Sequence, residues 1–314
     1  SLVEQMYTDF EDYGWSSGTY CQKVYQGYTT KVDKDVVIST WQSLYKMPRK
    51  YFDQFGCVIG DEAHMFKAKS LTGIMTKMHH CKYRFGLTGT LDGTQTHQLV
   101  LEGLFGAAEK VVTTKELIDK STLANLKIKC IVLKHPNIRK KMTYAEELEY
   151  IVSNEKRLDF VVNLLRHLRG NTLCLFQLVE KHGKILNDKM KGSENVYFVY
   201  GGTDTSDREK IRGLVETHTK STTIASFGVF STGINIRNIN NIVLASPSKS
   251  KIRVLQSIGR GLRRSDIKDS ILIYDIADDI SYNERRNFTL NHFTERLNIY
   301  NEEQFDYDIS KVKL

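Results

Sequence analysis

The 314-residue sequence predicts an α/β fold built from two tandem units with mostly parallel sheets. Short apolar runs rich in β-branched residues alternate with amphipathic stretches, which is the pattern of parallel strands connected by helices. The length suits about two domains of ordinary size, each able to bury its own core. A hydrophobic content of 40% and a charged content of 26% are typical of a globular protein.

The expected elements follow from these patterns. Strands are predicted at residues 36–39, 57–60, 83–87, 128–133, 173–177, 196–200, 222–225, 242–245 and 271–275. Helical spacing predicts helices at residues 206–218 and 251–264, the first with carboxylates in its first turn. Apolar residues between 282 and 300 predict a closing helix.

We divide the chain into a first domain at residues 1–122, a second at 123–285 and a C-terminal helical segment at 286–314. The domain connection is predicted within the polar stretch 113–153. Apolar residues from Leu2 onward already recur at helical spacing with no cap before them, and no Met precedes them. We therefore interpret the chain as a C-terminal piece of a longer protein.

Charge and cysteine usage restrict the function class. Lys plus Arg outnumber Asp plus Glu by 45 to 37, and the net charge of +8 favours a polyanionic partner. The five cysteines show no C-x-x-C spacing, so neither a zinc site nor a disulfide framework is indicated, and such single cysteines suit a reducing cytosol. No apolar run approaches the roughly 20 residues that cross a bilayer, so we predict a cytoplasmic protein without a membrane partner.

Two carboxylates follow directly on the apolar run at residues 57–60. Asp61 and Glu62 are therefore predicted at the C-terminal end of a buried strand, the edge where open α/β sheets bind ligands. One carboxylate there can hold Mg²⁺ while its neighbour, pointing the other way, orients an attacking water. The alternative is that both acids only cap the next helix.

A basic motif stands far downstream, where residues 256–263 read Gln-Ser-Ile-Gly-Arg-Gly-Leu-Arg. Gln256, Arg260 and Arg263 can share one helix face because they lie at spacings of four and three. Two guanidinium groups suit the charge that builds on a transferring phosphoryl group. The alternative is a solvated basic face. No Gly-x-x-x-x-Gly-Lys-Ser/Thr phosphate loop occurs in the sequence.

With these two motifs in this order, the chain resembles the catalytic core of superfamily-two helicases of the DEAH-box kind. Other segments match that family in order, namely residues 2–5, 39–43, 87–90, 201–203 and 230–236. The resemblance implies two RecA-like domains, the first incomplete at its N-terminus, and ATP and Mg²⁺ as cofactors. It covers almost the whole chain.

The resemblance also implies roles for the residues of the nucleotide site. Asp61 would hold Mg²⁺, Glu62 would be the general base for water, and His64 with Gln256 would link the nucleotide to the cleft between domains. Arg260 and Arg263 would be arginine fingers. Nucleotide contacts are further implied for Gly233 and Asn235, and Asn235 stands where the family more often has Asp.

The same resemblance implies nucleic-acid contacts through small hydroxyl residues and their neighbours. The residues concerned are Gln5, Thr40, Trp41, Thr88, Thr90, Gly202, Thr203 and Thr232. Hydroxyl groups suit contacts to phosphates, which position a strand without reading its sequence. Thr88 and Thr90 would also couple domain closure to hydrolysis. For each threonine, a loop or cap role is the alternative.

Within this family the chain is most similar to recombination DNA helicases of T-even phages. That similarity implies a monomeric, DNA-dependent ATPase in the host cytoplasm, acting on single-stranded and branched DNA, R-loops with their RNA–DNA hybrid, and recombination or stalled-fork intermediates, with strand annealing besides. An RNA helicase and a restriction-type translocase subunit are alternatives. A third is that this piece acts only as an ATP-independent nucleic-acid-binding module.

The phosphate loop of the family would precede Ser1. Because its amide donors and lysine charge bind the nucleotide, we expect residues 1–314 alone to be inactive as an ATPase. A parallel sheet without that strand would expose an apolar edge in the first domain, which we expect to be poorly stable alone. The second domain is expected to fold independently.

Overall fold

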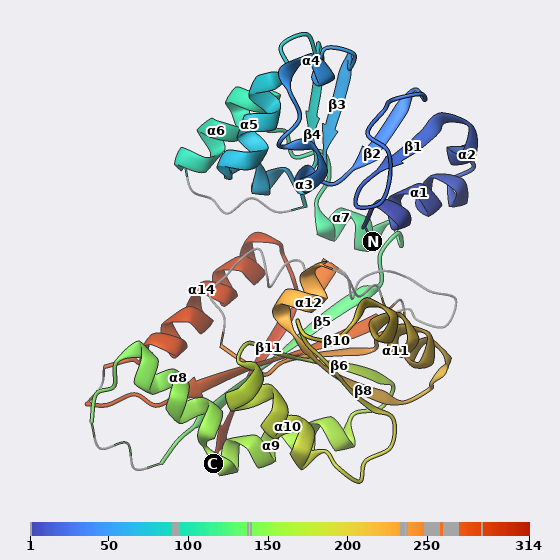
Figure 1. The fold of residues 1–314 in the computed structure, drawn as a ribbon. Helices are drawn as coiled ribbons and strands as arrows, with labels where there is room; N and C mark the ends of the chain where they lie inside the picture. Colours follow the sequence, from blue (N-terminus) through green and yellow to red (C-terminus); the bar gives the residue numbers. More distant parts are fainter. Residues whose placement is uncertain are drawn as a thin grey trace. The chain divides into compact units, whose positions relative to one another are not determined.

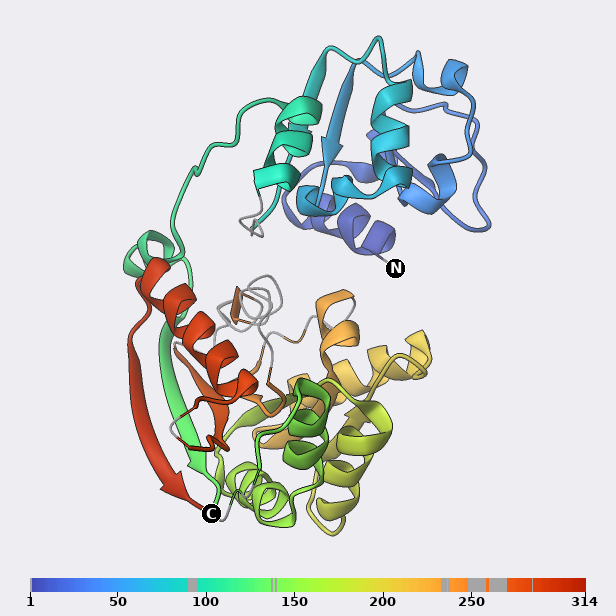
Figure 2. The same ribbon diagram turned by 90° about the vertical axis from the view of Figure 1, so that its left-hand side faces the viewer.

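The computed structural model describes residues 2–89, 95–136, 138, 140–232, 236, 238–247, 258–259, 270–283 and 285–314. The chain divides into two compact units, Ser1–Glu109 and Lys110–Leu314 (Figures 1 and 2). Parallel strands joined by helices make up both units, so the predicted α/β fold is confirmed. Among the residues described, no helix is long and apolar enough to cross a membrane.

The first unit combines short strands and helices. Its elements are α1 (Leu2–Asp12), α2 (Ser17–Tyr20), β1 (Cys21–Val24), β2 (Val36–Ser39), α3 (Trp41–Leu44), α4 (Arg49–Phe52), β3 (Cys57–Gly60), η1 (Ala63–Lys67), α5 (Lys69–Lys77), β4 (Tyr83–Gly86) and α6 (Gln95–Phe105). The described strands form two parallel pairs, β1 with β2 and β3 with β4. Strand β1 was not predicted from the sequence.

Two glycines let aromatic rings pack against the ends of β3 and β4. A Cβ atom on Gly60 would lie 2.7 Å from the Phe66 ring, and one on Gly86 would lie 2.9 Å from the Phe105 ring. The two rings meet edge to face at 5.1 Å. Together with α5 they form a small core that supports the strand end leading into Asp61.

One face of the β3–β4 pair is apolar and exposed. Cys57 and Ile59 pair in register with Tyr83 and Phe85, so the four side chains share this face. Ile59 is 64% exposed and both aromatic residues are 52% exposed. The prediction of a buried strand is therefore wrong for this face, because the described residues supply no element that covers it.

The described part of the second unit contains a seven-stranded parallel sheet of order β11-β5-β10-β9-β6-β8-β7. The strands are β5 (Asn125–Lys134), β6 (Asn171–Phe176), β7 (Val196–Val199), β8 (Ser221–Ser226), β9 (Asn241–Leu244), β10 (Ser270–Asp279) and β11 (Tyr307–Lys313). The helical elements are α7 (Thr114–Asp119), α8 (Tyr144–Ser153), α9 (Glu155–His167), η2 (Val179–Gly183), α10 (Lys184–Lys189), α11 (Thr205–Thr217), α12 (Phe227–Thr232) and α14 (Phe288–Glu302).

Helices cover both faces of this sheet, as its wholly buried central strands β6, β8 and β9 require. Helices α9 and α10 pack on one face, in a core with Leu158, Val161 and Leu186. Helices α11, α12 and α14 pack on the other, with Val215, Phe227 and Phe293 (Figure 1). The sheet thus has a separate hydrophobic core on each side.

The domain limits differ from those predicted. The chain divides after Glu109 rather than after residue 122, because α7 belongs to the second unit, where Thr114 Oγ1 donates to Glu303 Oε2 at 3.3 Å. The C-terminal segment is not only helical, since β11 pairs with β5 along its whole length. Its helix α14 is fixed to β10 by Arg296, whose Nη2 lies 2.8 Å from Asp275 Oδ1.

Candidate functional site

The acidic pair lies where β3 ends and the chain turns into η1. Leu87 N donates to Gly60 O at 2.8 Å, and Ala63 N donates to Leu87 O at 2.8 Å, so the end of β4 holds this turn on both sides. Glu62 has a φ of 50°, in the left-handed region that a non-glycine residue rarely adopts. Such strain persists where the surrounding structure fixes it, and it clusters at functional sites.

Four of the predicted residues come together at this turn. Asp61 Oδ1 accepts from Glu62 N at 2.9 Å, and Glu62 Oε2 lies 3.3 Å from His64 Nδ1. His64 Nδ1 also lies 3.0 Å from Thr88 Oγ1, in the segment after β4. His64 is 7% exposed, whereas Asp61 and Glu62 are exposed. A buried histidine therefore connects the acidic turn to Thr88.

The alternative that the two acids cap a helix does not agree with this geometry. Glu62 occupies the N-cap position of η1, but its side chain makes no capping hydrogen bond. Asp61 accepts from the neighbouring Glu62 amide, and both carboxylates extend to solvent. This arrangement suits a cation that takes one or two carboxylates together with phosphate oxygens, as Mg²⁺ does.

Three other predicted nucleic-acid residues of the first unit lie on or beside two helices. Gln5 is half-buried on α1. Thr40 precedes α3, and its Oγ1 lies 3.1 Å from Ser43 Oγ. Trp41 begins α3 and is 40% exposed. Of these three side chains, Trp41 presents the largest surface to a ligand.

In the second unit, Gly202 and Thr203 lie in the loop between β7 and α11. Tyr200 N donates to Thr203 Oγ1 at 3.1 Å, and Thr203 N donates to Tyr200 O at 3.0 Å. A Cβ atom on Gly202 would lie 2.7 Å from the Tyr200 ring. The Thr203 hydroxyl therefore closes its own turn, which is the loop role that the sequence left open.

The remaining predicted residues cannot be placed. Outside the described residues lie Thr90, Gly233, Asn235, Gln256, Arg260 and Arg263. Thr232 ends α12, and its side chain also falls outside the description. The described site is therefore the acidic turn with His64 and Thr88.

Sequence reasoning missed a buried polar cluster at the C-terminal ends of the second unit's strands. Arg157 Nε donates to Asp278 Oδ1 at 2.8 Å, and Arg157 Nη2 donates to Ala245 O at 2.8 Å. His135 Nε2 lies 2.8 Å from the same Asp278 oxygen, and all three charged or polar side chains are fully buried. The only signal in the sequence is an acid at the end of the apolar run 270–279.

His182 belongs to the same region, and its surroundings make the second unit sensitive to acid. Its Nδ1 lies 2.9 Å from Ser246 Oγ, just after β9. Burial lowers the pKa of His182 to about 3, and the Arg157 charge acts in the same direction. In the unfolded chain a histidine has a pKa near 6.5. The contribution of neutral His182 to the free energy of unfolding is therefore fully present above about pH 6.5 and is lost as the pH falls toward 3.

The variant H182N removes this titration while keeping a polar group beside Ser246. Between about pH 6 and pH 4 we expect the free energy of unfolding of the wild-type second unit to fall by about 1.4 kcal/mol per pH unit more than that of H182N. Urea unfolding followed by circular dichroism at several pH values measures both slopes. Equal slopes in the two proteins would contradict the assignment.

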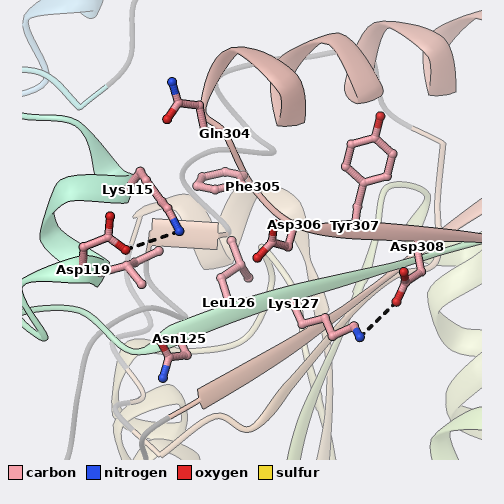
Figure 3. Close-up of a pocket in the computed structure, with 11 residues that line it drawn as sticks. Lys115, Asp119, Asn125, Leu126, Lys127, Gln304, Phe305, Asp306, Tyr307 and Asp308 are labelled. Atoms are coloured by element: carbon pink, nitrogen blue, oxygen red, sulfur yellow. Dashed lines mark ion pairs between the residues drawn. The ribbon is translucent and has the colours of Figure 1, made fainter.

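A pocket of about 570 Å³ lies elsewhere in the second unit, between α7 and the starts of β5 and β11 (Figure 3). Two ion pairs flank it, Lys115 with Asp119 at 3.3 Å and Lys127 with Asp308 at 3.1 Å. None of the predicted site residues lines this pocket. It lies at the N-terminal ends of the strands, whereas ligands of open α/β sheets bind at the C-terminal ends.

Comparison with known families agrees with this two-part organisation. Residues 1–93 match the family described as type III restriction enzyme, res subunit. Residues 156–265 match the helicase conserved C-terminal domain. The two matches lie in the first and second unit respectively.

Known proteins and solved structures also resemble the chain. It is 34% identical over 336 residues to the ATP-dependent DNA helicase UvsW of Enterobacteria phage T4, covering 100% of the chain and 67% of that protein. The crystal structure of T4 UvsW matches with a TM-score of 0.53 over 99% of the chain and 66% of that structure. More distant viral relatives, 24% and 22% identical, are covered over 47% and 52% of their length.

Two more distant structures show the same fold. Saccharomyces cerevisiae Dbp5 bound to RNA and ADP BeF3 matches with a TM-score of 0.62 at 15% identity, over 99% of the chain and 75% of that structure. The restriction-modification enzyme LlaBIII bound to DNA matches with a TM-score of 0.61 at 13% identity, over 99% of the chain and 24% of that structure. Both units are thus RecA-like, and the chain belongs to the superfamily-two ATP-dependent helicases, in the family that includes UvsW of phage T4.

Proposed function

We propose that the chain is the core of an ATP-driven DNA helicase or translocase that acts on branched DNA, R-loops with their RNA–DNA hybrid, and recombination or stalled-fork intermediates, with strand annealing as a further activity. The observation that carries the proposal is the turn in which Asp61, Glu62, His64 and Thr88 meet. The 34% identity to a DNA helicase favours DNA as the substrate. The protein is proposed to act as a monomer in the host cytoplasm.

The acidic turn supports a role in ATP hydrolysis. Mg²⁺, when bound, neutralises charge on the nucleotide phosphates. Asp61 is proposed to hold this ion, because it offers an exposed carboxylate directly beside the strand end. Glu62 is proposed to accept a proton from the attacking water, and its φ of 50° is a strained conformation of the kind that clusters at functional sites.

The other residues have supporting roles in this proposal. Arg260 and Arg263 stabilise charge on the transferring phosphoryl group, and Gln256 with His64 links the nucleotide to the second unit. Gly233 and Asn235 contact the nucleotide. Strand contacts are proposed for Gln5, Thr40, Trp41, Thr88, Thr90, Gly202, Thr203 and Thr232. The contact of His64 with Thr88 gives a physical link from the acidic turn to the segment that contains Thr90.

The choice between DNA and RNA can be tested by ATP hydrolysis in the intact protein. We expect forked DNA and single-stranded DNA to stimulate hydrolysis more than single-stranded RNA of the same length. The variant E62Q should lower stimulated kcat by about 10²- to 10⁴-fold, because it removes the general base. E102Q is the matched control, since Glu102 lies on α6 in the same unit.

Stronger stimulation by RNA would favour the RNA-helicase alternative, and undiminished hydrolysis by E62Q would contradict the role of Glu62. Residues 1–314 alone should bind nucleic acid with little hydrolysis. Rapid hydrolysis by this piece would refute the reading that it is only a binding module.

A further inference from the structure

Two aromatic rings lie exposed beside each other just after β2. Trp41 on α3 is 40% exposed, and Tyr45, directly after α3, is 37% exposed. Their ring centroids are 5.6 Å apart, and the rings meet at 63°. Two exposed rings side by side offer flat faces on which a planar ligand can stack.

The main chain below these rings is held firmly. Lys77 Nζ donates to Tyr45 O at 2.7 Å and to Met47 O at 2.8 Å. Leu44 and Met47 pack against the core of the first unit. Leu44, Met47 and Lys77 therefore fix the main chain that carries both rings to the first unit.

Three cations accompany the rings. Lys46 Nζ lies 5.5 Å from the centroid of the Tyr45 ring, and Arg49 and Lys50 follow at the start of α4. All three are exposed, and among the described residues none of them forms an ion pair with a carboxylate. Residues 36–52 contain no Asp or Glu. The exposed side chains beside the rings are therefore aromatic or cationic, and the nearest acid along the chain is Asp53, directly after α4.

A second exposed aromatic pair in this unit lacks these properties. Trp15 and Tyr20 already stack on each other, with centroids 5.7 Å apart and an angle of 11° between the rings. Glu11 and Asp12 lie directly before them in the chain. Acids next to the rings disfavour a polyanion, so Trp41 and Tyr45 are the stronger candidates.

We propose that Trp41 and Tyr45 stack on bases of a single strand of nucleic acid while Lys46, Arg49 and Lys50 contact its phosphates. Aromatic faces bind bases of any sequence, and cations beside them follow the backbone. The inference rests on the proposed nucleic-acid function. The inference adds to that function a contact with the bases themselves. A surface that contacted only the backbone of the strand would need no aromatic rings.

Tryptophan fluorescence tests the stacking directly in residues 1–314, which contain two tryptophans. In the variant W15F, Trp41 is the sole reporter. We expect thymidine oligonucleotide to quench its fluorescence, and an abasic oligonucleotide of equal length to leave it nearly unchanged. The variant W41F, which keeps Trp15, should show no difference between the two ligands.

Binding constants separate the rings from the cations. Y45A should bind thymidine oligonucleotide about fivefold or more weakly, with unchanged affinity for the abasic strand. Its main-chain contacts to Lys77 remain, so the unit should stay folded. Y13A is the matched control, since Tyr13 is 87% exposed in the same unit. Replacing Lys46, Arg49 and Lys50 with Gln should weaken binding of both ligands and lower the salt slope by about two.

Equal binding of both oligonucleotides with unchanged Trp41 fluorescence would overturn the stacking proposal and leave a backbone-only binding surface. Loss of binding in Y13A as large as in Y45A would also overturn it. If residues 1–314 bind neither oligonucleotide, the nucleic-acid function fails together with this inference. Binding without stacking therefore overturns this inference alone, whereas the absence of binding overturns both proposals.

Discussion

Replacing Arg260 and Arg263 together by alanine in the intact protein is expected to lower kcat for DNA-stimulated ATP hydrolysis by about 10³-fold or more, with DNA affinity largely retained. Arginine fingers contribute about 10³- to 10⁵-fold to phosphoryl transfer, because their charge opposes the negative charge that spreads over the transferring group. This charge is greatest in the transition state. The loss should therefore appear in kcat rather than in KM.

Lys251 provides the control. It begins the predicted helix at residues 251–264 and lies five residues before Gln256 and nine before Arg260, outside the spacings of three and four that join Gln256, Arg260 and Arg263 on one helix face. K251A should hydrolyse ATP at close to the wild-type rate. Steady-state kinetics with saturating single-stranded DNA, together with fluorescence anisotropy for DNA affinity, measure both effects. Similar losses in K251A and in the double variant would support a general basic face instead of two arginine fingers.

The sequence predicted most strands of this fold because buried parallel strands are continuous apolar runs. The runs at 222–225 and 242–245 correspond to β8 and β9 within one residue at each end. Strand β11 was missed because its residues alternate with charged ones, and it is an exposed edge strand whose pairing with β5 links distant parts of the chain. Edge strands carry a weaker hydrophobic signal than central ones.

The acidic turn was predicted because carboxylates that directly follow an apolar run are expected at the end of a strand. The geometry of the turn supports this reason. The contact between His64 and Thr88 joins residues from two strand ends, which local spacing does not show. The positive φ of Glu62 has no sequence signal either, because glycine is the residue expected there. Contacts between residues that are distant in the sequence could therefore be found only in the structure.

The buried Arg157–Asp278 pair is another contact that the sequence does not show. Its disruption should lower the free energy of unfolding of the second unit more than any other change considered. Both side chains are fully buried, with Arg157 Nε 2.8 Å from Asp278 Oδ1. Burial raises the pKa of Asp278, but the Arg157 charge and hydrogen bonds from His135 and Arg157 outweigh it, so the net pKa is lowered. R157M leaves this carboxylate buried without its cation, and the expected loss is about 3–5 kcal/mol.

The double variant R157M/D278N tests whether this loss comes from the unpaired charge. If it does, the double variant should be more stable than the sum of the single changes by about 1–3 kcal/mol. K127M is the control, because Lys127 and its partner Asp308 are 56% and 69% exposed, and such a pair contributes at most about 1 kcal/mol.

The two tryptophans make this measurement selective, because both lie in the first unit. During urea unfolding, tryptophan fluorescence follows the first unit, while circular dichroism follows both. R157M should move only the dichroism transition to lower urea. A shift of the fluorescence transition by the same amount would mean that the substitution disturbs the whole chain, and strictly additive losses would show that the charge pair is not the cause.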